Sequence, residues 1–198
     1  MDVDFGRDSR VWLGIYEIEL AQHVRALCEP GSACFDIGAE GGFYALVFAR
    51  LGGSRVLAVE ANADTCARLR RSVAANPAFA PSIEVRHAQV VGRTDDARGQ
   101  VSLDDLAYGP GGFVPDLVKL DVEGKEKTTL RGAARLLDER KPHLIVETHS
   151  KELDDACRAI LVSHGYNAQT VEPRRWLPEV RSATLNRWLV APGTPRRP

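Results

Sequence analysis

Short apolar segments alternate with helical segments along most of this chain, and this alternation restricts its fold more than any other feature. The strands are predicted at residues 33–37, 56–59, 83–87, 117–122 and 144–147. The helices that separate and follow them are predicted at residues 43–51, 65–75, 128–137 and 153–164. Parallel strands need long crossover connections, which are usually helices. The pattern therefore predicts a doubly wound α/β fold with a mostly parallel sheet covered on both faces.

The two ends of the chain depart from this alternation. An N-terminal helix is predicted at residues 11–27, within an N-terminal region 1–30. The strand-like runs 166–171 and 185–190 have only a loop between them, so they are predicted to pair as an antiparallel hairpin at the sheet edge. Residues 192–198 contain three prolines and two arginines and are predicted to be a disordered tail. The prediction is a single domain over residues 1–191.

The composition favours a globular domain that acts on small molecules. The 198 residues are 44% hydrophobic and 27% charged, within the range of one compact domain. A formal net charge of -1 provides no basic field to attract nucleic acid or an anionic membrane, so neither is an expected partner. Monomer and homodimer are both compatible with the sequence.

The cysteines and the N-terminal residues point to a reducing compartment. The four cysteines are scattered without metal-ligand spacing, which is typical of small buried apolar residues. The first ten residues carry acids where a secretory signal would be basic, and no run of about eighteen apolar residues occurs. We therefore expect a cytoplasmic protein.

The first two strand exits are candidates for a nucleoside site, because ligands of open α/β sheets bind beyond the carboxyl ends of the strands. The first exit reads FDIGAEGGF, where Asp36 ends the strand, Gly38 allows close backbone approach, and Gly41 and Gly42 supply a turn. Glu60 ends the second strand and could accept hydrogen bonds from ribose hydroxyls. Each feature alone also fits a packing turn or a solvated acid; together they favour a nucleoside.

Glu40 indicates which nucleoside. It occupies the place of the second glycine in the dinucleotide pattern G-x-G-x-x-G, where its charge would repel a pyrophosphate. It would tolerate a cofactor with a sulfonium and an ammonium, which is the charge pattern of S-adenosylmethionine. A nicotinamide-dependent oxidoreductase should have the complete glycine pattern and a helix before its final strand, and the sequence predicts neither.

At these motifs the sequence resembles the FkbM-like family of class I methyltransferases, from about residue 33 to residue 192. The matching blocks are DIGAEGGFYAL, VLAVEANAD, LVKLDVEGKE and PHLIVETH. The resemblance implies cofactor contacts from Asp36, Gly38, Ala39, Gly42, Glu60, Ala61 and Asn62, with Ala88 and Gln89 near the adenine, and the charge of Glu40 adds this residue to the expected cofactor site. Glu40 replaces the family's usual asparagine, a departure that concerns the contacts to the methionine end.

The resemblance also implies an activity, S-adenosylmethionine-dependent O-methylation of a hydroxyl group on a sugar or secondary metabolite. Two alternatives remain open. One is a non-catalytic nucleoside-binding domain, and the other is a methyltransferase that acts on RNA or protein. The near-neutral charge argues against RNA.

Two strand exits carry the candidate catalytic residues. Because alternate side chains of an extended strand point the same way, each of these two strands points a group of mostly polar residues in one direction. The groups are Lys119, Asp121 and Glu123 on one strand, and His143, Ile145, Glu147 and His149 on the other. Lys119 lies within a central strand, so we expect it to pair with a carboxylate.

We select Asp121, Glu123 and His149 as catalytic candidates. An imidazole near neutral pH can accept the proton of a hydroxyl, which makes His149 the candidate general base. A structural role is an equally good interpretation of His149, and Glu123 could instead begin the next helix. Together with Glu147 these residues could also bind magnesium or manganese. We favour transfer without a metal, because a buried ion-pair network explains the same residues.

Overall fold

The structure is a computed structural model that describes residues 16–172 and 187–195, and it contains one seven-stranded sheet with the order β3-β2-β1-β6-β7-β9-β8. The strands are β1 (Ala33–Ile37), β2 (Arg55–Glu60), β3 (Ile83–His87), β6 (Leu117–Leu120), β7 (His143–Thr148), β8 (Gln169–Val171) and β9 (Arg187–Ala191). The first five of these are parallel, and β9 runs antiparallel to both β7 and β8. The predicted doubly wound fold and its C-terminal hairpin are confirmed.

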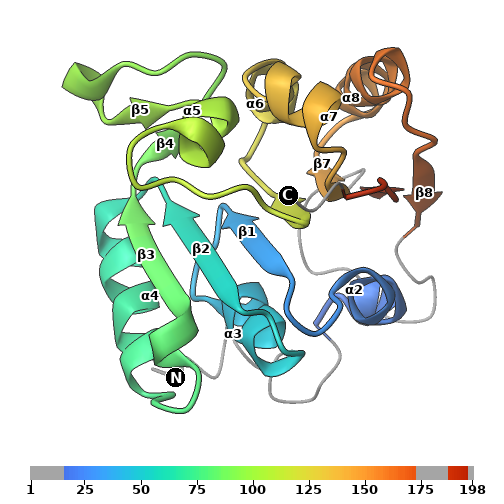
Figure 1. Cartoon of the computed structure of the whole chain (residues 1–198). Helices are drawn as coiled ribbons and strands as arrows, with labels where there is room; N and C mark the ends of the chain where they lie inside the picture. Colours follow the sequence, from blue (N-terminus) through green and yellow to red (C-terminus); the bar gives the residue numbers. More distant parts are fainter. Residues whose placement is uncertain (1–15, 173–186, 196–198) are drawn as a thin grey trace.

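Helices cover both faces of this sheet (Figure 1). One face packs against α2 (Ala21–Leu27), α3 (Phe43–Arg50) and α4 (Ala63–Ala74). The other packs against α5 (Leu103–Tyr108), α6 (Glu126–Arg131), α7 (Ala134–Glu139) and α8 (Lys151–Ser163). Alternation along β1 explains why both faces are apolar: Phe35 and Ile37 join one core cluster and Cys34 joins the other.

The helix predicted at residues 128–137 is divided into α6 and α7, because the backbone there lies close to that of a distant segment around Val91. Gly132 lies between them, and a Cβ on this residue would lie 2.6 Å from the carbonyl oxygen of Val91. The carbonyl of Gly132 accepts a hydrogen bond from the backbone N–H of Asp104 instead of continuing the helix. The helical periodicity of the sequence contains no trace of this contact between distant segments.

The strand predicted at residues 117–122 ends early, at Leu120. The backbone N–H of Asp121 still donates to Ile37, but Glu123 and Gly124 have φ values of 48° and 90°, which turn the chain away. The assumption that Lys119, Asp121 and Glu123 lie along one extended strand is therefore wrong at its last residue. This turn carries Glu123 to the site from a different direction.

The predicted ends of the chain are partly corrected. Within the predicted helix 11–27, a turn at Tyr16–Glu17 and the 3₁₀ helix η1 (Ile18–Leu20) precede α2, and residues 11–15 lie outside the described residues. Glu17 has a left-handed φ of 42° and accepts a hydrogen bond from the Tyr44 hydroxyl, a tertiary contact that ends the helix.

The C-terminal predictions also shift. The second hairpin strand begins at Arg187, and most of the loop predicted between the two strands lies outside the described residues. Residues 192–195, predicted to be part of the disordered tail, lie against the start of β7, where the Gly193 N–H donates to His143 Nδ1 at 3.0 Å. Residues 196–198 lie outside the described residues.

The segment between β3 and β6 contains elements that the sequence pattern did not predict. These are the two-stranded parallel pair β4 (Gln89–Val90) and β5 (Gln100–Val101), the helix α5, and the 3₁₀ helix η3 (Asp96–Arg98); a further unpredicted 3₁₀ helix, η2 (Ala80–Ser82), comes just before β3. Two-residue strands carry too little periodicity to detect.

Two other sequence predictions can be compared with the described residues. All four cysteines are free and buried, as the sequence predicted. Across residues 16–172 and 187–195, no helix combines the length and apolar character that crossing a membrane requires.

Candidate functional site

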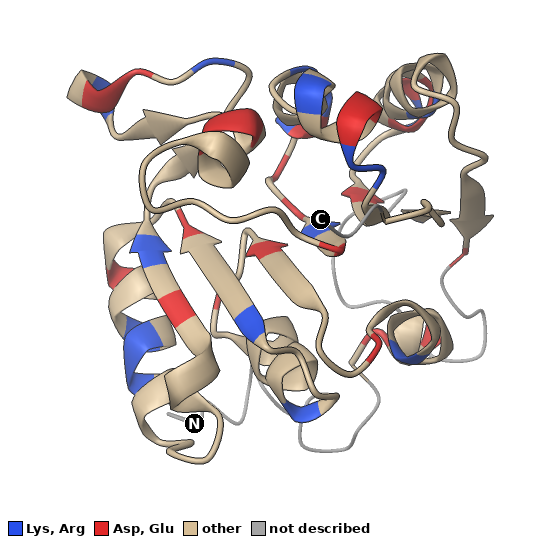
Figure 2. Cartoon of the chain, viewed as in Figure 1, with Lys and Arg blue, Asp and Glu red and all other residues tan. Residues whose placement is uncertain are grey.

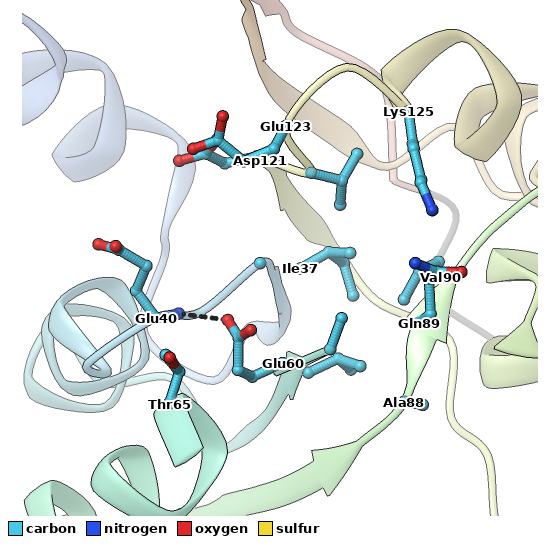
Figure 3. Close-up of a pocket in the computed structure, with 14 residues that line it drawn as sticks. Ile37, Glu40, Glu60, Thr65, Ala88, Gln89, Val90, Asp121, Glu123 and Lys125 are labelled. Atoms are coloured by element: carbon cyan, nitrogen blue, oxygen red, sulfur yellow. Dashed lines mark hydrogen bonds between the residues drawn. The ribbon is translucent and has the colours of Figure 1, made fainter. Parts of the chain in front are cut away.

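A pocket of about 330 Å³ opens at the carboxyl ends of β1, β2, β3 and β6, where the doubly wound fold places ligands. Acidic residues stand at the tips of β1 and β2 in Figure 2, and Figure 3 shows the pocket in detail. Its lining residues are Ile37, Gly38, Glu40, Val59, Glu60, Ala61, Thr65, Ala88, Gln89, Val90, Asp121, Val122, Glu123 and Lys125. The charged side chains of this lining are thus four carboxylates and the ammonium group of Lys125.

The turn after β1 brings two strand exits into contact. Gly38 has a φ of 80°, and a Cβ on it would overlap the backbone carbonyl of Asp121. Its N–H and that of Ala39 both donate to the Val59 carbonyl of β2, at 2.9 and 3.0 Å. Only glycine fits this position, because it combines a left-handed backbone with contact to a neighbouring main chain.

Glu60 organises the opposite wall of the pocket. Its Oε2 accepts the Glu40 N–H at 3.0 Å, the contact drawn in Figure 3, and its Oε1 accepts the Asn62 N–H at 2.8 Å. A carboxylate has about four acceptor sites. Each oxygen of Glu60 therefore keeps capacity for another donor, such as a ribose hydroxyl.

The structure divides the predicted cofactor residues into two groups. Those that line the pocket are Gly38, Glu40, Glu60, Ala61, Ala88 and Gln89. The second group does not line the pocket in the described part of the chain, and it consists of Asp36, Ala39, Gly42 and Asn62. Asp36 is buried, and burial raises its pKa to about 6 although the Lys119 charge opposes this. Asn62 caps α4 by accepting the Thr65 N–H at 3.0 Å.

His149 lies at the centre of a cluster of carboxylates next to this pocket. Its Nδ1 is 2.8 Å from Glu126 Oε1. Its Nε2 is 3.5 Å from Asp121 Oδ1, 3.7 Å from Glu123 Oε2 and 4.0 Å from Glu147 Oε1. The three predicted catalytic residues Asp121, Glu123 and His149 are therefore brought together. Two of them, Asp121 and Glu123, also line the pocket.

Lys119 pairs with a carboxylate, as the sequence predicted. Its Nζ lies 3.3 Å from Asp121 Oδ2 and 4.7 Å from the centre of the Tyr44 ring. Burial opposes the charged form of this lysine, but Asp121 and the other carboxylates around it together outweigh burial and raise the pKa of Lys119. Burial likewise opposes charge on Asp121, but the Lys119 ammonium, the hydrogen bond with Glu147 and the His149 charge together outweigh burial and lower the pKa of Asp121. The pair fixes β6 at the pocket edge.

The cluster changes the protonation of its own members. The hydrogen bond that His149 donates to Glu126 raises the pKa of His149 to about 9, against the effect of burial and with the help of the Asp121 charge. Burial, with the negative charge of Asp121, raises the pKa of Glu147 to about 8. At neutral pH the imidazole is therefore a cation, and it becomes a base when that proton leaves.

Asp121, Glu123 and His149 could also hold a divalent cation. One ligand atom from each lies within 4.8 Å of the others. Carboxylate oxygens and one imidazole suit magnesium or manganese. The same geometry also suits an imidazolium ion held by carboxylates, and this second interpretation needs no other component.

Sequence reasoning missed Glu126, which touches His149 more closely than any residue it selected. Glu126 is fully buried, and its Oε1 also accepts the Gly124 N–H at 2.9 Å. The only signal was its place at the end of the block LVKLDVEGKE. Thr65 and Lys125 were also missed as pocket residues, and Figure 3 shows Lys125 and Gln89 on the side of the pocket opposite Glu40.

Replacing Glu40 by asparagine should stabilise the protein. Glu40 has a left-handed φ of 44°, a conformation that costs most residues about 1–2 kcal/mol and that asparagine adopts more readily. We expect Glu40→Asn to raise the free energy of unfolding by roughly 0.5–1 kcal/mol in urea denaturation. Glu40→Gln is the control, because it removes the charge but keeps the backbone cost. Equal stabilities of the two variants would contradict the argument.

Comparison with known protein families gives one match. Residues 86–168 match the model of the methyltransferase FkbM domain. This segment includes the blocks around Asp121 and Glu147, and over it the sequence resemblance is confirmed. No curated protein matches the sequence.

Solved structures share the fold over most of the chain. The methyltransferase FkbM from Methylobacillus flagellatus KT is 21% identical with a TM-score of 0.65, over 81% of this chain and 43% of that one. This chain thus spans less than half of that protein's length. A SAM-dependent O-methyltransferase from Thermotoga maritima is 16% identical with a TM-score of 0.63, over 92% and 67% of the two chains. Aeropyrum pernix fibrillarin with bound S-adenosyl-L-methionine is 15% identical with a TM-score of 0.59, over 83% and 68%.

Proposed function

We infer that this chain, with its class I methyltransferase fold and FkbM domain match, is an S-adenosylmethionine-dependent methyltransferase, and we propose that its acceptor is a hydroxyl group of a small molecule. One observation carries the proposal. The pocket joins Glu60, the acid suited to a ribose, to Asp121 and Glu123, which contact the imidazole of His149.

The residues of the pocket fit S-adenosylmethionine in charge and in hydrogen bonding. Glu40, Asp121 and Glu123 place negative charge where a sulfonium and an ammonium would be stabilised. Glu60 has acceptor capacity for ribose hydroxyls. Ile37, Val59 and Val90 supply the apolar surface that an adenine ring needs.

The chemistry requires one proton acceptor from the protein. S-adenosylmethionine, when bound, would supply a methyl carbon for the hydroxyl oxygen to attack, so that an O–C bond forms, the C–S bond breaks, and S-adenosylhomocysteine leaves as a neutral thioether. His149 Nε2, in its unprotonated form, takes the proton that the hydroxyl loses. Asp121 and Glu123, at 3.5 and 3.7 Å from this nitrogen, stabilise the imidazolium that results.

The charges at the site support a small neutral acceptor. Asp121 and Glu123 lie beside the nitrogen that would face the acceptor. These carboxylates would repel a phosphate backbone, and the net charge of -1 gives no compensating basic field. A hydroxyl of a sugar or secondary metabolite meets neither obstacle.

Replacing Glu60 by alanine tests the cofactor site. We expect wild-type protein to bind S-adenosylmethionine and S-adenosylhomocysteine in calorimetric titrations, and NADH not to bind. Glu60→Ala should weaken both by roughly 10–200-fold, because one lost charged hydrogen-bond partner is worth about 1.5–3 kcal/mol. Glu84→Ala is the control, because Glu84 is an exposed acid on the neighbouring strand β3 that pairs with Arg55. A folded wild-type protein that binds neither compound would overturn the proposal.

The acceptor class is tested by transfer of radiolabelled methyl groups. Monosaccharides, phenols and hydroxylated macrolactones would be offered together with a tRNA and a protein extract, each with magnesium and with EDTA. Labelling of a small hydroxyl compound supports the proposal. Labelling confined to the tRNA or the proteins would refute the acceptor class while leaving the cofactor site intact.

A further inference from the structure

Glu126 pairs with His149, and methyl transfer as derived above gives Glu126 no role. Glu126 is the first residue of α6 and is completely buried, whereas His149 follows β7 and is 17% exposed. They come from segments 23 residues apart, and Glu126 Oε1 lies 2.8 Å from His149 Nδ1. At this distance the nitrogen carries the proton and the carboxylate accepts it.

The same carboxylate is itself fixed in place. Glu126 Oε1 accepts the N–H of Gly124, whose φ of 90° belongs to the turn that ends β6. The oxygen that holds His149 is thus tied to the loop that carries Asp121 and Glu123 into the pocket. One carboxylate oxygen therefore contacts both this loop and the imidazole.

The two ring nitrogens of His149 have different surroundings. Nδ1 has a short contact to one buried oxygen. Nε2 lies 3.5 Å or more from Asp121, Glu123 and Glu147, beyond the usual N–H···O range of about 2.7–3.2 Å. A ring held at Nδ1 therefore presents Nε2 to the rim of the pocket.

We propose that Glu126 is the positioning residue of the reaction: it holds the proton of His149 on Nδ1 and fixes the ring so that Nε2 faces the methyl acceptor. This inference rests on the proposed function. Glu126 does not touch the reacting atoms. Its contribution is the orientation of the base, since misplacement of a catalytic group by about 1 Å can cost about 100-fold in rate.

A double-mutant cycle distinguishes positioning from simple stabilisation of α6. With the acceptor that gives the fastest labelling, Glu126→Ala should lower kcat roughly 100-fold, while the S-adenosylmethionine Kd stays within about twofold of wild type. Glu126→Gln keeps an oxygen acceptor for Nδ1 and should recover about tenfold of this loss. In a His149→Ala background, Glu126→Ala should change kcat by less than about twofold, because the residues act as a unit.

Glu139→Gln is the matched control, since it makes the same carboxylate-to-amide change as Glu126→Gln, but on α7, where Glu139 pairs with Arg135 at 3.1 Å. It should leave kcat unchanged in both backgrounds. Independent, multiplying effects of Glu126→Ala and His149→Ala would show that Glu126 only stabilises the fold, and would overturn the proposal while the proposed function stands.

A measurement without turnover tests the same geometry. In the full chain with ¹⁵N-labelled histidine, spectra at pH 10 should show His149 with its proton on Nδ1, and Glu126→Gln should shift the ring toward a mixture of tautomers. A wild-type ring with its proton on Nε2 would overturn the proposal. Because this readout needs neither cofactor nor acceptor, it remains decisive even if the protein fails to bind S-adenosylmethionine, which is the failure of the proposed function.

Discussion

His149→Ala should lower kcat by roughly 10²–10⁴-fold, the usual contribution of a general base. The loss should leave the Kd of S-adenosylmethionine almost unchanged, because His149 is not among the residues that line the pocket in the described part of the chain. Separate measurements of kcat and of cofactor binding therefore locate the defect in the chemical step.

The pH dependence gives the same prediction a sign. The ionisable side chains around His149 are Glu126 on α6, Asp121 and Glu123 after β6, and Glu147 on β7. Lys119 pairs with Asp121. The hydrogen bond to Glu126 raises the pKa of His149 to about 9, so the ring is protonated and inactive as a base below that value. We expect kcat/KM to rise with pH, to reach half of its maximum near pH 9 and to level off above that pH. This rise of kcat/KM with pH should disappear in His149→Ala.

His164→Ala is the matched control. His164 is 18% exposed, and its Nδ1 lies 2.7 Å from Asp138, so it resembles His149 in burial and in pairing with an acid. It belongs to the far end of α8 and should leave both kcat and the pH profile intact. If His149→Ala kept full activity, another group would have to remove the proton, and the assignment of the base would be wrong.

Gly38→Ala should destabilise the protein and abolish cofactor binding together. An alanine at a φ of 80° costs about 1–2 kcal/mol, and forcing its Cβ against the Asp121 carbonyl adds a typical overpacking cost of about 1–3 kcal/mol. We expect the free energy of unfolding to fall by roughly 2–5 kcal/mol. Relief of the overlap must separate β1 from the loop after β6, and these two segments form the pocket floor.

Gly111→Ala isolates the part of this effect that depends on contact. Gly111 has a φ of 74°, close to that of Gly38, but no atom lies within 4 Å of the position of its Cβ. This variant should lose only about 1 kcal/mol and should bind S-adenosylmethionine like wild type. Denaturation and calorimetry of both variants provide the comparison. Equal losses would mean that backbone conformation alone, and not the approach of Asp121, makes glycine necessary at position 38.

The sequence by itself determined the layers of the fold and the location of the pocket. Periodicity decides which faces of strands and helices are apolar, and apolar faces must be buried. This was enough to predict the parallel sheet, the C-terminal hairpin and the glycine turn after β1. The same logic placed Glu60, Asp121 and His149 at one end of the sheet, because parallel strands present their exits at a common edge.

Only the tertiary structure decided which side chains at that edge line the pocket and which contact other residues of the protein. Asp36 and Asn62 read as cofactor contacts in the sequence, but one is buried behind the pocket and the other caps α4. In the sequence Glu126 was only the last residue of the block LVKLDVEGKE, whereas in the structure its carboxylate contacts His149. A linear pattern records which residues stand near a strand exit. The distance between two side chains from different strands depends on turns such as Glu123–Gly124, and their left-handed geometry comes from packing between segments far apart in the chain.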